Sequence, residues 1–363
     1  MKRAVVMCVI AALVLLGGVA LAQTDRSRPF PKAEPGYVLE FPRDEGSHAD
    51  FRTEWWYLTG WLEDDAGKQF GFQVTFFRRR PGIDETNPSR FAAKQLLFAH
   101  ASLSDLREGR LLRDERTARA GFGLAEAQEG AMNVYIDDWR LQRRGTDGVI
   151  HAAVATDDFV FDLALQTEQT PLLQGHNGYS QKGPGREAAS HYYSVPHLQA
   201  TGSVAIRGKR FAVRGSAWLD HEWFDLVLDE AARGWDWTGL NLNDGSAVMA
   251  FRMRDAQGRE RWASGTWRER GDTRTFGRDE IDWLPVRRWR SGRTGVEFPV
   301  EWQLRIGERT IRLRPLLDDQ ENDARGSTGT LYWEGPVRAF DEAGRAIGRG
   351  YLELTGYGDP IRM

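Results

Sequence analysis

The 363-residue sequence contains a single cysteine, Cys8, which lies inside an apolar stretch near the N-terminus. If that stretch is removed on export, the mature chain has no thiol at all. Disulfide bonds, thiol catalysis and cysteine-ligated metal sites are therefore excluded for the exported form. The stability of the fold must then come from a hydrophobic core.

An excess of one charge is also missing, because 49 lysines and arginines nearly balance 52 acidic residues. The formal net charge is −3, and no block of like charges is longer than Arg78-Arg79-Arg80. These three arginines are predicted to end a strand that faces water. Nothing in the charge pattern indicates a nucleic-acid partner.

The N-terminus has the three parts of a secretory signal peptide. Met1-Lys2-Arg3 is basic, residues 4–21 are apolar, and Ala20-Leu21-Ala22 offers a cleavage site. Residues 1–22 are therefore expected to be removed, which leaves 363 − 22 = 341 residues in the periplasm or outside the cell. The alternative is an uncleaved membrane anchor, since an apolar stretch of this length can just span a bilayer.

Long amphipathic helices are scarce, and residues 111–120 are the best helical candidate. The remaining pattern is one of short alternating segments, which are divided by hairpin-type turns such as Asp65-Ala66-Gly67 and Asn243-Asp244-Gly245. Strands of this length and spacing favour antiparallel sandwiches or barrels. The fold class is therefore predicted to be all-β.

Two Trp-rich segments resemble each other. Residues 54–60, Glu-Trp-Trp-Tyr-Leu-Thr-Gly, are echoed by residues 234–239, Gly-Trp-Asp-Trp-Thr-Gly, at an offset of 238 − 59 = 179 positions. An offset of about half the chain predicts two related β-modules that could enclose a ligand between or inside them. Folded structure is expected to begin near His48. The predicted divisions are an extended segment at 23–47, one module at 48–205 and a second at 206–363, and the predicted ligand-binding residues are Trp56, Tyr57, His100, Trp235 and Trp237.

Residues 218–222 carry the main candidate for chemistry. Along a strand, Trp218, Asp220 and Glu222 share one face, while Leu219 and His221 share the other. Desolvation beside an indole would raise the pKa of Asp220, so that the protonated carboxyl could act as a general acid near neutral pH. The alternative is structural, with Asp220 capping a turn and His221 making an ordinary hydrogen bond.

Metal ligation and hydrolysis are two further alternatives. Asp220, His221 and Glu222 with His191 or His197 offer ligand atoms, but adjacent residues of a strand point oppositely, so no metal and no cofactor is expected. No Gly-x-Ser-x-Gly elbow supports a serine hydrolase. A separate polar set, His48, Glu54 and His100, fits a structural network or a ligand contact.

Several motifs resemble those of a known family, the lipocalin-like proteins grouped with AttH and the carotenoid 1,2-hydratases. They span most of the chain. The motifs are His48 with Glu54-Trp55-Trp56-Tyr57, Phe98 to Asp105, Gly215 to Trp223, Gly234-Trp235-Asp236-Trp237, Tyr332-Trp333-Glu334-Gly335 and Gly350 to Tyr357.

This resemblance implies two lipocalin-like antiparallel β-domains in tandem, each a barrel or sandwich. For the hydratase branch it implies cofactor-free, acid-catalysed addition of water to an isoprenoid double bond. The implied residues are His191 with Tyr193, and Trp218 with Asp220. Tyr193 stands where the hydratases typically have Trp, and Trp218 where they have Tyr, so the chain resembles more closely the AttH-like branch. That branch comprises exported proteins that are often described as secreted hydrolases and are linked with ABC-type permeases. Fungal relatives resemble pericyclases.

We therefore expect an exported protein that binds an extended hydrophobic molecule, such as a lipid, an isoprenoid or a polyketide. Asp220 would be the general acid, His191 would orient it or water, and Tyr193 and Trp218 would shape the cavity. A non-catalytic carrier that works with an ABC-type permease is the main alternative. A third possibility, a module that binds only protein, predicts no lipid-sized cavity.

Overall fold

The computed structural model describes residues 30–83, 85–105, 109–145, 148–225 and 231–360. The expected signal peptide at 1–22, including Cys8, lies outside these residues. Regular structure in the described part consists of β-strands and two short 3-10 helices, η1 (Arg43–Glu45) and η2 (Arg278–Glu280). Neither helix is long and apolar enough to cross a membrane. The prediction of an all-β fold is confirmed.

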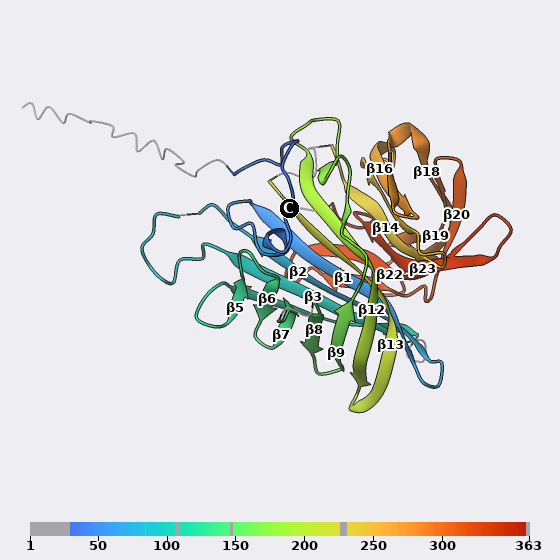
Figure 1. Cartoon of the computed structure of the whole chain (residues 1–363). Coiled ribbons are helices and arrows are strands. Elements are labelled where there is room, and N and C mark those ends of the chain that lie inside the picture. The colour runs from blue at the N-terminus through green and yellow to red at the C-terminus, as the bar shows by residue number, and fades with distance from the viewer. Residues whose placement is uncertain (1–29, 84, 106–108, 146–147, 226–230, 361–363) are drawn as a thin grey trace, which may run out of the picture.

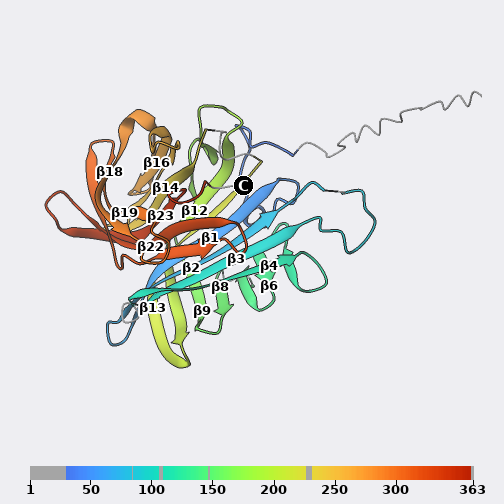
Figure 2. The same cartoon turned by 180° about the vertical axis from the view of Figure 1, so that it is seen from behind.

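Among the described residues, thirteen strands form a first antiparallel sheet in the order β4-β3-β2-β1-β13-β12-β9-β8-β7-β6-β5, with β10 and β11 paired to β12. The sheet curves strongly, as Figures 1 and 2 show from opposite sides. Its strands are β1 (Thr53–Asp64), β2 (Gln69–Arg79), β3 (Leu96–Asp105), β4 (Arg110–Arg119), β5 (Ala125–Ala127), β6 (Asn133–Ile136), β7 (Trp139–Arg143), β8 (Ile150–Ala155), β9 (Phe159–Gln166), β10 (Leu172–Leu173), β11 (Tyr179–Gln181), β12 (Ala189–Ile206) and β13 (Lys209–Phe224).

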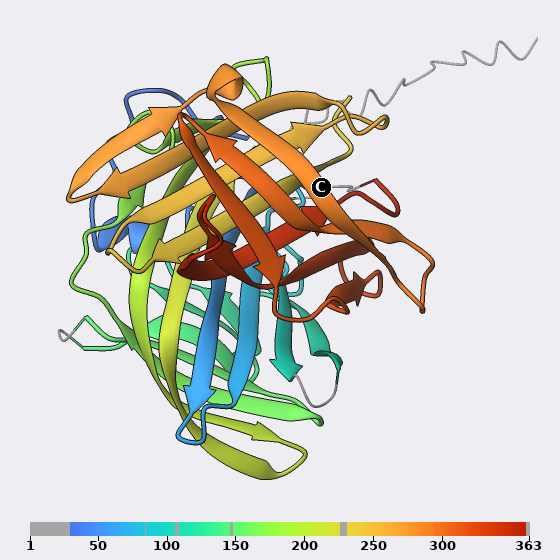
Figure 3. The same cartoon turned by 90° about the vertical axis from the view of Figure 1, so that its right-hand side faces the viewer.

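A second antiparallel sheet contains ten described strands in the order β17-β16-β15-β14-β23-β22-β20-β19-β18, with β21 paired to β22. It is the yellow-to-red sheet that lies above the first in Figure 3. Its strands are β14 (Gly234–Leu242), β15 (Ala247–Arg254), β16 (Glu260–Glu269), β17 (Asp272–Phe276), β18 (Ile281–Arg290), β19 (Glu297–Ile306), β20 (Arg309–Pro315), β21 (Glu321–Ala324), β22 (Thr330–Phe340) and β23 (Ala346–Thr355).

The two sheets share one plan, which explains the echo in the sequence. In each sheet the first strand pairs with the second strand and with the last, so that β1 lies between β2 and β13, and β14 lies between β15 and β23. The two Trp-rich segments are thus equivalent first strands. Their hairpins occupy the same position in the two halves of the molecule.

Sheet pairing places the division of the chain later than expected. The division predicted between residues 205 and 206 falls at the turn between β12 and β13, and β13 pairs with both β1 and β12. The first sheet therefore runs to Phe224, and the second begins at Gly234. The pairing of β13 with the distant strand β1 cannot be recognised from the sequence of β13 itself.

Two other expectations are corrected. Residues 111–120 form most of strand β4 rather than a helix, because pairing with β3 at the edge of the sheet outweighs local helix propensity. Ordered contacts also begin before His48, since Asp44 and Glu45 of η1 are buried against the first sheet. The segment at 23–47 is therefore not extended throughout, because its described part contains the 3-10 helix η1, which packs against the first sheet.

Three clusters of buried apolar side chains hold the fold together. One lies inside the first sheet, one inside the second, and a third lies between the sheets. The third cluster joins Tyr192 and Trp218 of the first sheet to Trp237 and Phe251 of the second. The contact is close: a Cβ at Gly239 would lie 2.9 Å from the Trp218 ring, so only glycine fits there.

Candidate functional site

A cavity of about 330 Å³ lies between the two sheets. Strands β1, β2, β3, β12 and β13 contribute one wall, and β14, β15, β22 and β23 contribute the other. Most of its surface is apolar, and it belongs to neither sheet alone. Its aromatic lining includes Trp55, Tyr57, Phe77, Trp235, Trp237 and Phe251.

Strand β13 brings Asp220 to this cavity by simple alternation. Asp220 and Glu222 line the cavity, whereas His221 points to the opposite face, where it meets Glu54. Trp218 lies on the same face as Asp220 and donates its indole N–H to Asp220 Oδ1 over 2.7 Å. The arrangement predicted for Trp218, Asp220 and Glu222 is therefore the one observed.

The Asp220 carboxyl is 3% exposed and is held by uncharged donors in the described part of the chain. Besides the Trp218 indole, Ser194 Oγ donates to Oδ1 over 2.5 Å, and Tyr192 Oη donates to Oδ2 over 2.8 Å. Burial raises the pKa of Asp220 to about 7, although these hydrogen bonds oppose the shift. Near neutral pH the protonated and ionised forms of this carboxyl are therefore both populated.

Two further carboxyls, Glu334 and Glu353, reach the cavity from the other wall and were not identified from the sequence. They stand directly opposite each other on β22 and β23. Glu334 accepts a hydrogen bond from Tyr57 Oη over 3.0 Å, and Glu353 accepts one from Trp235 Nε1 over 3.0 Å. Burial raises the pKa of Glu353 to about 7 and that of Glu334 well above its usual value. A single glutamate in the middle of each of two otherwise apolar segments, Leu331 to Val337 and Tyr351 to Leu354, is the signal that could have revealed them.

One ion pair also borders the cavity. Lys182 Nζ lies 2.9 Å from Glu222 Oε1, and both side chains are nearly buried. The ammonium also packs over the rings of Tyr192 and Phe251, at 4.4 and 4.3 Å from their centroids. Lys182 lies directly after β11, in the connection to β12.

Four of the five predicted ligand-binding residues, Tyr57, His100, Trp235 and Trp237, line the cavity. The fifth, Trp56, lies on the opposite face of β1. Its ring stacks on His221 at a centroid distance of 4.6 Å, and its indole N–H donates to the Glu45 carbonyl. Adjacent residues of a strand face opposite sides, so Trp56 cannot share the cavity with Tyr57.

His191 and Tyr193 are likewise placed away from Asp220. Both lie on the face of β12 that points into the first sheet: Tyr193 Oη lies 3.2 Å from His221 Nδ1, and the His191 ring packs against Tyr37. Their neighbour Tyr192 occupies the position beside Asp220 instead. The prediction that His191 and Tyr193 lie beside Asp220 is therefore wrong. The residue of β12 that faces Asp220 is Tyr192, which lies between them in the sequence.

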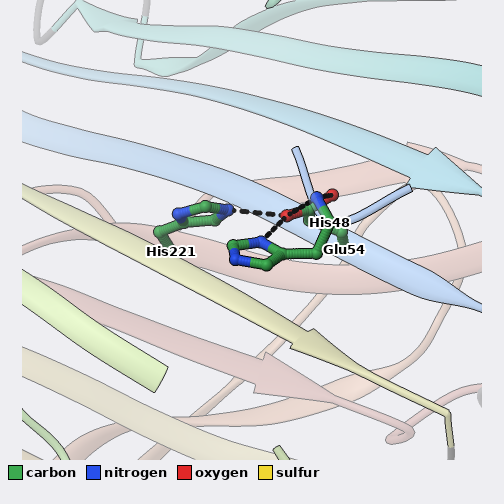
Figure 4. A group of neighbouring side chains, drawn as sticks. All are labelled: His48, Glu54 and His221. Carbon is green, nitrogen blue, oxygen red and sulfur yellow. Dashed lines mark hydrogen bonds and ion pairs between the residues drawn. The ribbon is translucent and has the colours of Figure 1, made fainter. Parts of the chain in front are cut away.

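The opposite face of β1 and β13 carries a charged cluster, of which Figure 4 shows three members. Glu54 Oε1 contacts His48 Nδ1 at 2.8 Å and His221 Nε2 at 2.9 Å, and Glu54 Oε2 accepts from Arg78 Nε at 2.8 Å. Burial alone would raise the pKa of Glu54, but Arg78 and the two imidazoles hold it well below its usual value. Arg78 is thus buried, and not exposed to water as predicted.

His48, Glu54 and His221 are near enough to one another to bind a metal ion. The same atoms are already engaged with one another, however, and the Arg78 guanidinium at Glu54 would repel a cation. The predicted network of His48 and Glu54 thus forms with His221 and Arg78, while His100 lies at the cavity. The other suggested set cannot share an ion, because Asp220 and His221 lie on opposite faces of β13.

The family of the chain follows from comparison of its sequence. The model of the AttH-like family matches residues 32–357. This chain belongs to the AttH-like family. It matches no curated protein.

Solved structures share the fold of this AttH-like protein. A crystal structure of a candidate AttH from Nitrosomonas europaea is 46% identical, with a TM-score of 0.85, and the match covers 90% of this chain and 100% of that one. Kievitone hydratase from Nectria haematococca is 15% identical, with a TM-score of 0.68 over 91% of this chain and 96% of that one. CghA, solved with Sch210972, is 14% identical, with a TM-score of 0.52 over 85% and 89%. At such identities the last two share only the fold.

Proposed function

We propose that this AttH-like protein binds an unsaturated apolar molecule in the cavity between its sheets and adds water across a double bond. The observation that carries the proposal is the Asp220 carboxyl, which is buried beside an aromatic cavity, held by neutral donors and has a pKa of about 7. Such a group is protonated often enough near pH 7 to act as a general acid. The hydratase among the proteins of similar fold is consistent with this chemistry.

The reaction balances without a cofactor. The O–H bond of Asp220 breaks as a C–H bond forms on one alkene carbon, which leaves a carbocation on the other. The faces of the lining tryptophan and tyrosine rings stabilise that cation by roughly 0.5–2 kcal/mol each. Water then forms the C–O bond, and its released proton returns to the Asp220 carboxylate. The same steps in reverse describe elimination of water from an alcohol.

The size of the cavity limits the ligand. About 330 Å³ lies at the lower end of the range of roughly 300–1,000 Å³ for small-molecule sites. A compact terpenoid or polyketide fits this volume, and a long carotenoid would place only one end inside it. We therefore narrow the expected extended ligand to a compact molecule or to the end of a chain.

The proposal is tested by incubating the protein with a panel of C10 and C15 terpenoid alkenes in H₂¹⁸O, with mass spectrometry of the products. Wild-type protein should yield an alcohol that carries ¹⁸O, and Asp220→Asn should lower turnover by about 10²–10⁴-fold. Equal turnover in Asp220→Asn would exclude the acid role. His191→Asn is the matched control: it should leave turnover unchanged, because His191 faces away from the cavity.

The carrier alternative makes different predictions for the same proteins. A carrier forms no product from any alkene, and Asp220→Asn changes only its affinity, by a modest factor. Native mass spectrometry of protein purified from its own host would then show an unmodified apolar molecule bound to it. Such a result, together with the absence of labelled alcohol, would replace the enzymatic proposal with transfer of cargo to or from an ABC-type permease.

We further propose that the protein acts outside the cytoplasm. The proposal rests on the signal-like residues 1–22. Intact-mass analysis of protein from its own host should show a chain that begins at Gln23. A mass that includes residues 1–22 would indicate a retained anchor or an uncleaved leader.

A further inference from the structure

A row of hydrogen bonds leads from the cavity wall to the surface of the molecule. Tyr332 Oη, on the cavity wall, lies 2.8 Å from His100 Nδ1. The other ring nitrogen, His100 Nε2, lies 3.0 Å from Ser327 Oγ. Ser327 in turn donates to Oε2 of Glu115, a partly exposed residue, over 2.7 Å. The contacts are short throughout, so the row is continuous.

Both sheets contribute to this row. His100 and Glu115 stand opposite each other on β3 and β4, and their side chains therefore share one side of the first sheet. Ser327 and Tyr332 come from the second sheet, from the turn after β21 and from β22. Gly326 leaves room for the outer end, since a Cβ there would lie 2.4 Å from Glu115 Oε1.

The donors and acceptors fit only one order. Ser327 donates to Glu115, so its oxygen must accept the N–H of His100 Nε2. His100 Nδ1 is then the acceptor for the Tyr332 hydroxyl. A neutral imidazole is needed for this order, and burial, with a contribution from Arg113, lowers the pKa of His100 to about 3.

At its inner end, Tyr332 lies beside Glu334, the carboxyl opposite Glu353 in the cavity. Because the Tyr332 proton is directed to His100, the Tyr332 oxygen can accept a proton from Glu334. Glu334 is 1% exposed. Its two oxygens also accept from Tyr57 Oη and Asn322 Nδ2. Both oxygens are thus engaged by protein donors, and the Tyr332 hydroxyl offers a route through the protein for a proton that leaves this acid.

We propose that Tyr332, His100, Ser327 and Glu115 form a proton path that connects the cavity carboxyl Glu334 with solvent. If the protein catalyses the proposed hydration, the path would restore the protonation states of the cavity carboxyls after each reaction. This role rests on the proposed function. The path itself requires the observed hydrogen bonds from Tyr332 to Glu115 and a proton transfer between Glu334 and the neighbouring Tyr332 hydroxyl. His100 and Ser327 are then positioning and relay residues, and His100 is more than a ligand contact.

The transfer balances group by group. The Glu334 proton moves to Tyr332 Oη as the Tyr332 proton moves to His100 Nδ1. The proton on His100 Nε2 moves to Ser327 Oγ, and the Ser327 proton moves to Glu115. Afterwards Glu334 is a carboxylate, Glu115 is protonated, and His100 is the other neutral tautomer. Release of the Glu115 proton to water completes the transfer. Rotation of the hydroxyls resets Tyr332 and Ser327, and His100 returns to its first tautomer when it gains a proton at Nε2 and loses the one at Nδ1.

The path can be tested without a substrate by infrared spectroscopy after rapid transfer from H₂O to D₂O. The C=O stretching band of protonated Glu334, assigned by its loss in Glu334→Gln, shifts when the carboxyl exchanges its proton. Ser327→Ala should slow this exchange by about tenfold or more, because the path loses its only hydroxyl between imidazole and carboxylate. Ser327→Thr, which restores a hydroxyl, should recover the wild-type rate.

Thr328→Val is the matched control. Thr328 lies in the same turn, but its hydroxyl bonds to Thr330 and to the Ala324 carbonyl, so the exchange rate should not change. Gly326→Ala, which displaces Glu115, should also slow the exchange. This second variant tests the path even if Ser327→Ala does not fold. Exchange within about twofold of wild type in both variants would overturn the path. Turnover is not measured, so this result is independent of the hydratase assay.

Discussion

Two buried carboxyls on paired strands, Glu54 of β1 and Asp220 of β13, behave in opposite ways. Both are almost inaccessible to water, at 0% and 3% exposure. Glu54 is held by Arg78 and two imidazoles, and its pKa is well below the usual value. Asp220 is held by a phenol, an alcohol and an indole, and its pKa rises to about 7. Burial alone therefore does not decide protonation; the charge of the hydrogen-bonding partners does.

The difference separates structure from chemistry across one sheet. On the Glu54 face, opposite charges neutralise one another and anchor the segment around η1 to the first sheet. On the Asp220 face, uncharged partners leave the carboxyl close to its protonation midpoint, where it can give up and recover a proton. Each prediction below either removes this contrast or measures it.

The largest effect is expected for Glu54→Gln. The substitution leaves the buried Arg78 without its carboxylate, which should cost about 3–5 kcal/mol of unfolding free energy. Urea denaturation at pH 7 measures it. Asp220→Asn is the contrasting variant: its amide can satisfy the same neutral partners, so the loss should be about 1 kcal/mol or less. Equal losses in the two variants would remove the distinction between the faces.

The second prediction concerns pH. The folded-state pKa of Asp220, about 7, lies above its ordinary value of 3.8, so the folded state binds more protons between these values. Stability from this group is therefore greatest below pH 3.8 and falls as pH rises towards 7, by at most about 4 kcal/mol. Asp220→Asn should lack this fall.

Denaturation of both proteins at pH 4, 5.5 and 7 isolates the contribution of Asp220. Other titrating groups, including Glu54, are present in both proteins, and their contributions cancel in the difference. Glu353 is the exception, because the charge of Asp220 contributes to its raised pKa. A difference between the two proteins that does not change with pH would mean that Asp220 is ionised throughout, like Glu54.

The sequence predicts which residues share each face of β13. It does not predict which residues from remote segments lie opposite those faces. Alternation along the strand places Trp218, Asp220 and Glu222 on one face, and the raised pKa of Asp220 follows from its burial beside the Trp218 ring. Glu334, Glu353 and Lys182 come from remote segments, and no local pattern ties them to Asp220. The one-residue error at His191 and Tyr193 has the same origin, because motif resemblance does not specify which alternate residues face the cavity.

Long-range pairing explains the other errors. Strand β13 closes the first sheet by pairing with β1, as in Leu58 with Leu219, which are 219 − 58 = 161 positions apart. The Arg207-Gly208 turn before β13 looks like any other hairpin, so nothing local indicates that the first sheet continues beyond it. The charged segment of β4 has good local helix propensity, and only the edge of β3 makes it a strand.

The third prediction concerns a carboxylate that loses its charged partner and is left, like Asp220, without a cation beside it. Lys182→Met removes the ammonium from Glu222, which then lies beside the cavity with no counter-ion. We expect a loss of about 2–3 kcal/mol at pH 8 that shrinks towards pH 5, because the carboxyl can take up a proton and become neutral. Unfolding free energies at the two pH values measure it. Adding Glu222→Gln should remove the pH dependence of the loss, and a loss independent of pH in Lys182→Met would indicate a packing defect instead.

The smallest effect distinguishes neighbouring tyrosines on opposite faces of β12. Tyr192→Phe removes the hydroxyl that donates to Asp220 Oδ2 over 2.8 Å and so removes a bond that favours the carboxylate. The pKa of Asp220 should rise by up to about one unit, equivalent to about 1.4 kcal/mol. Infrared titration of the protonated carboxyl band, assigned with Asp220→Asn, measures the shift. Tyr193→Phe is the control: its hydroxyl meets His221 instead, so the midpoint should stay in place. If Tyr193→Phe shifted the midpoint as much as Tyr192→Phe, the two faces would be electrically coupled and the contrast between Glu54 and Asp220 would need a different cause.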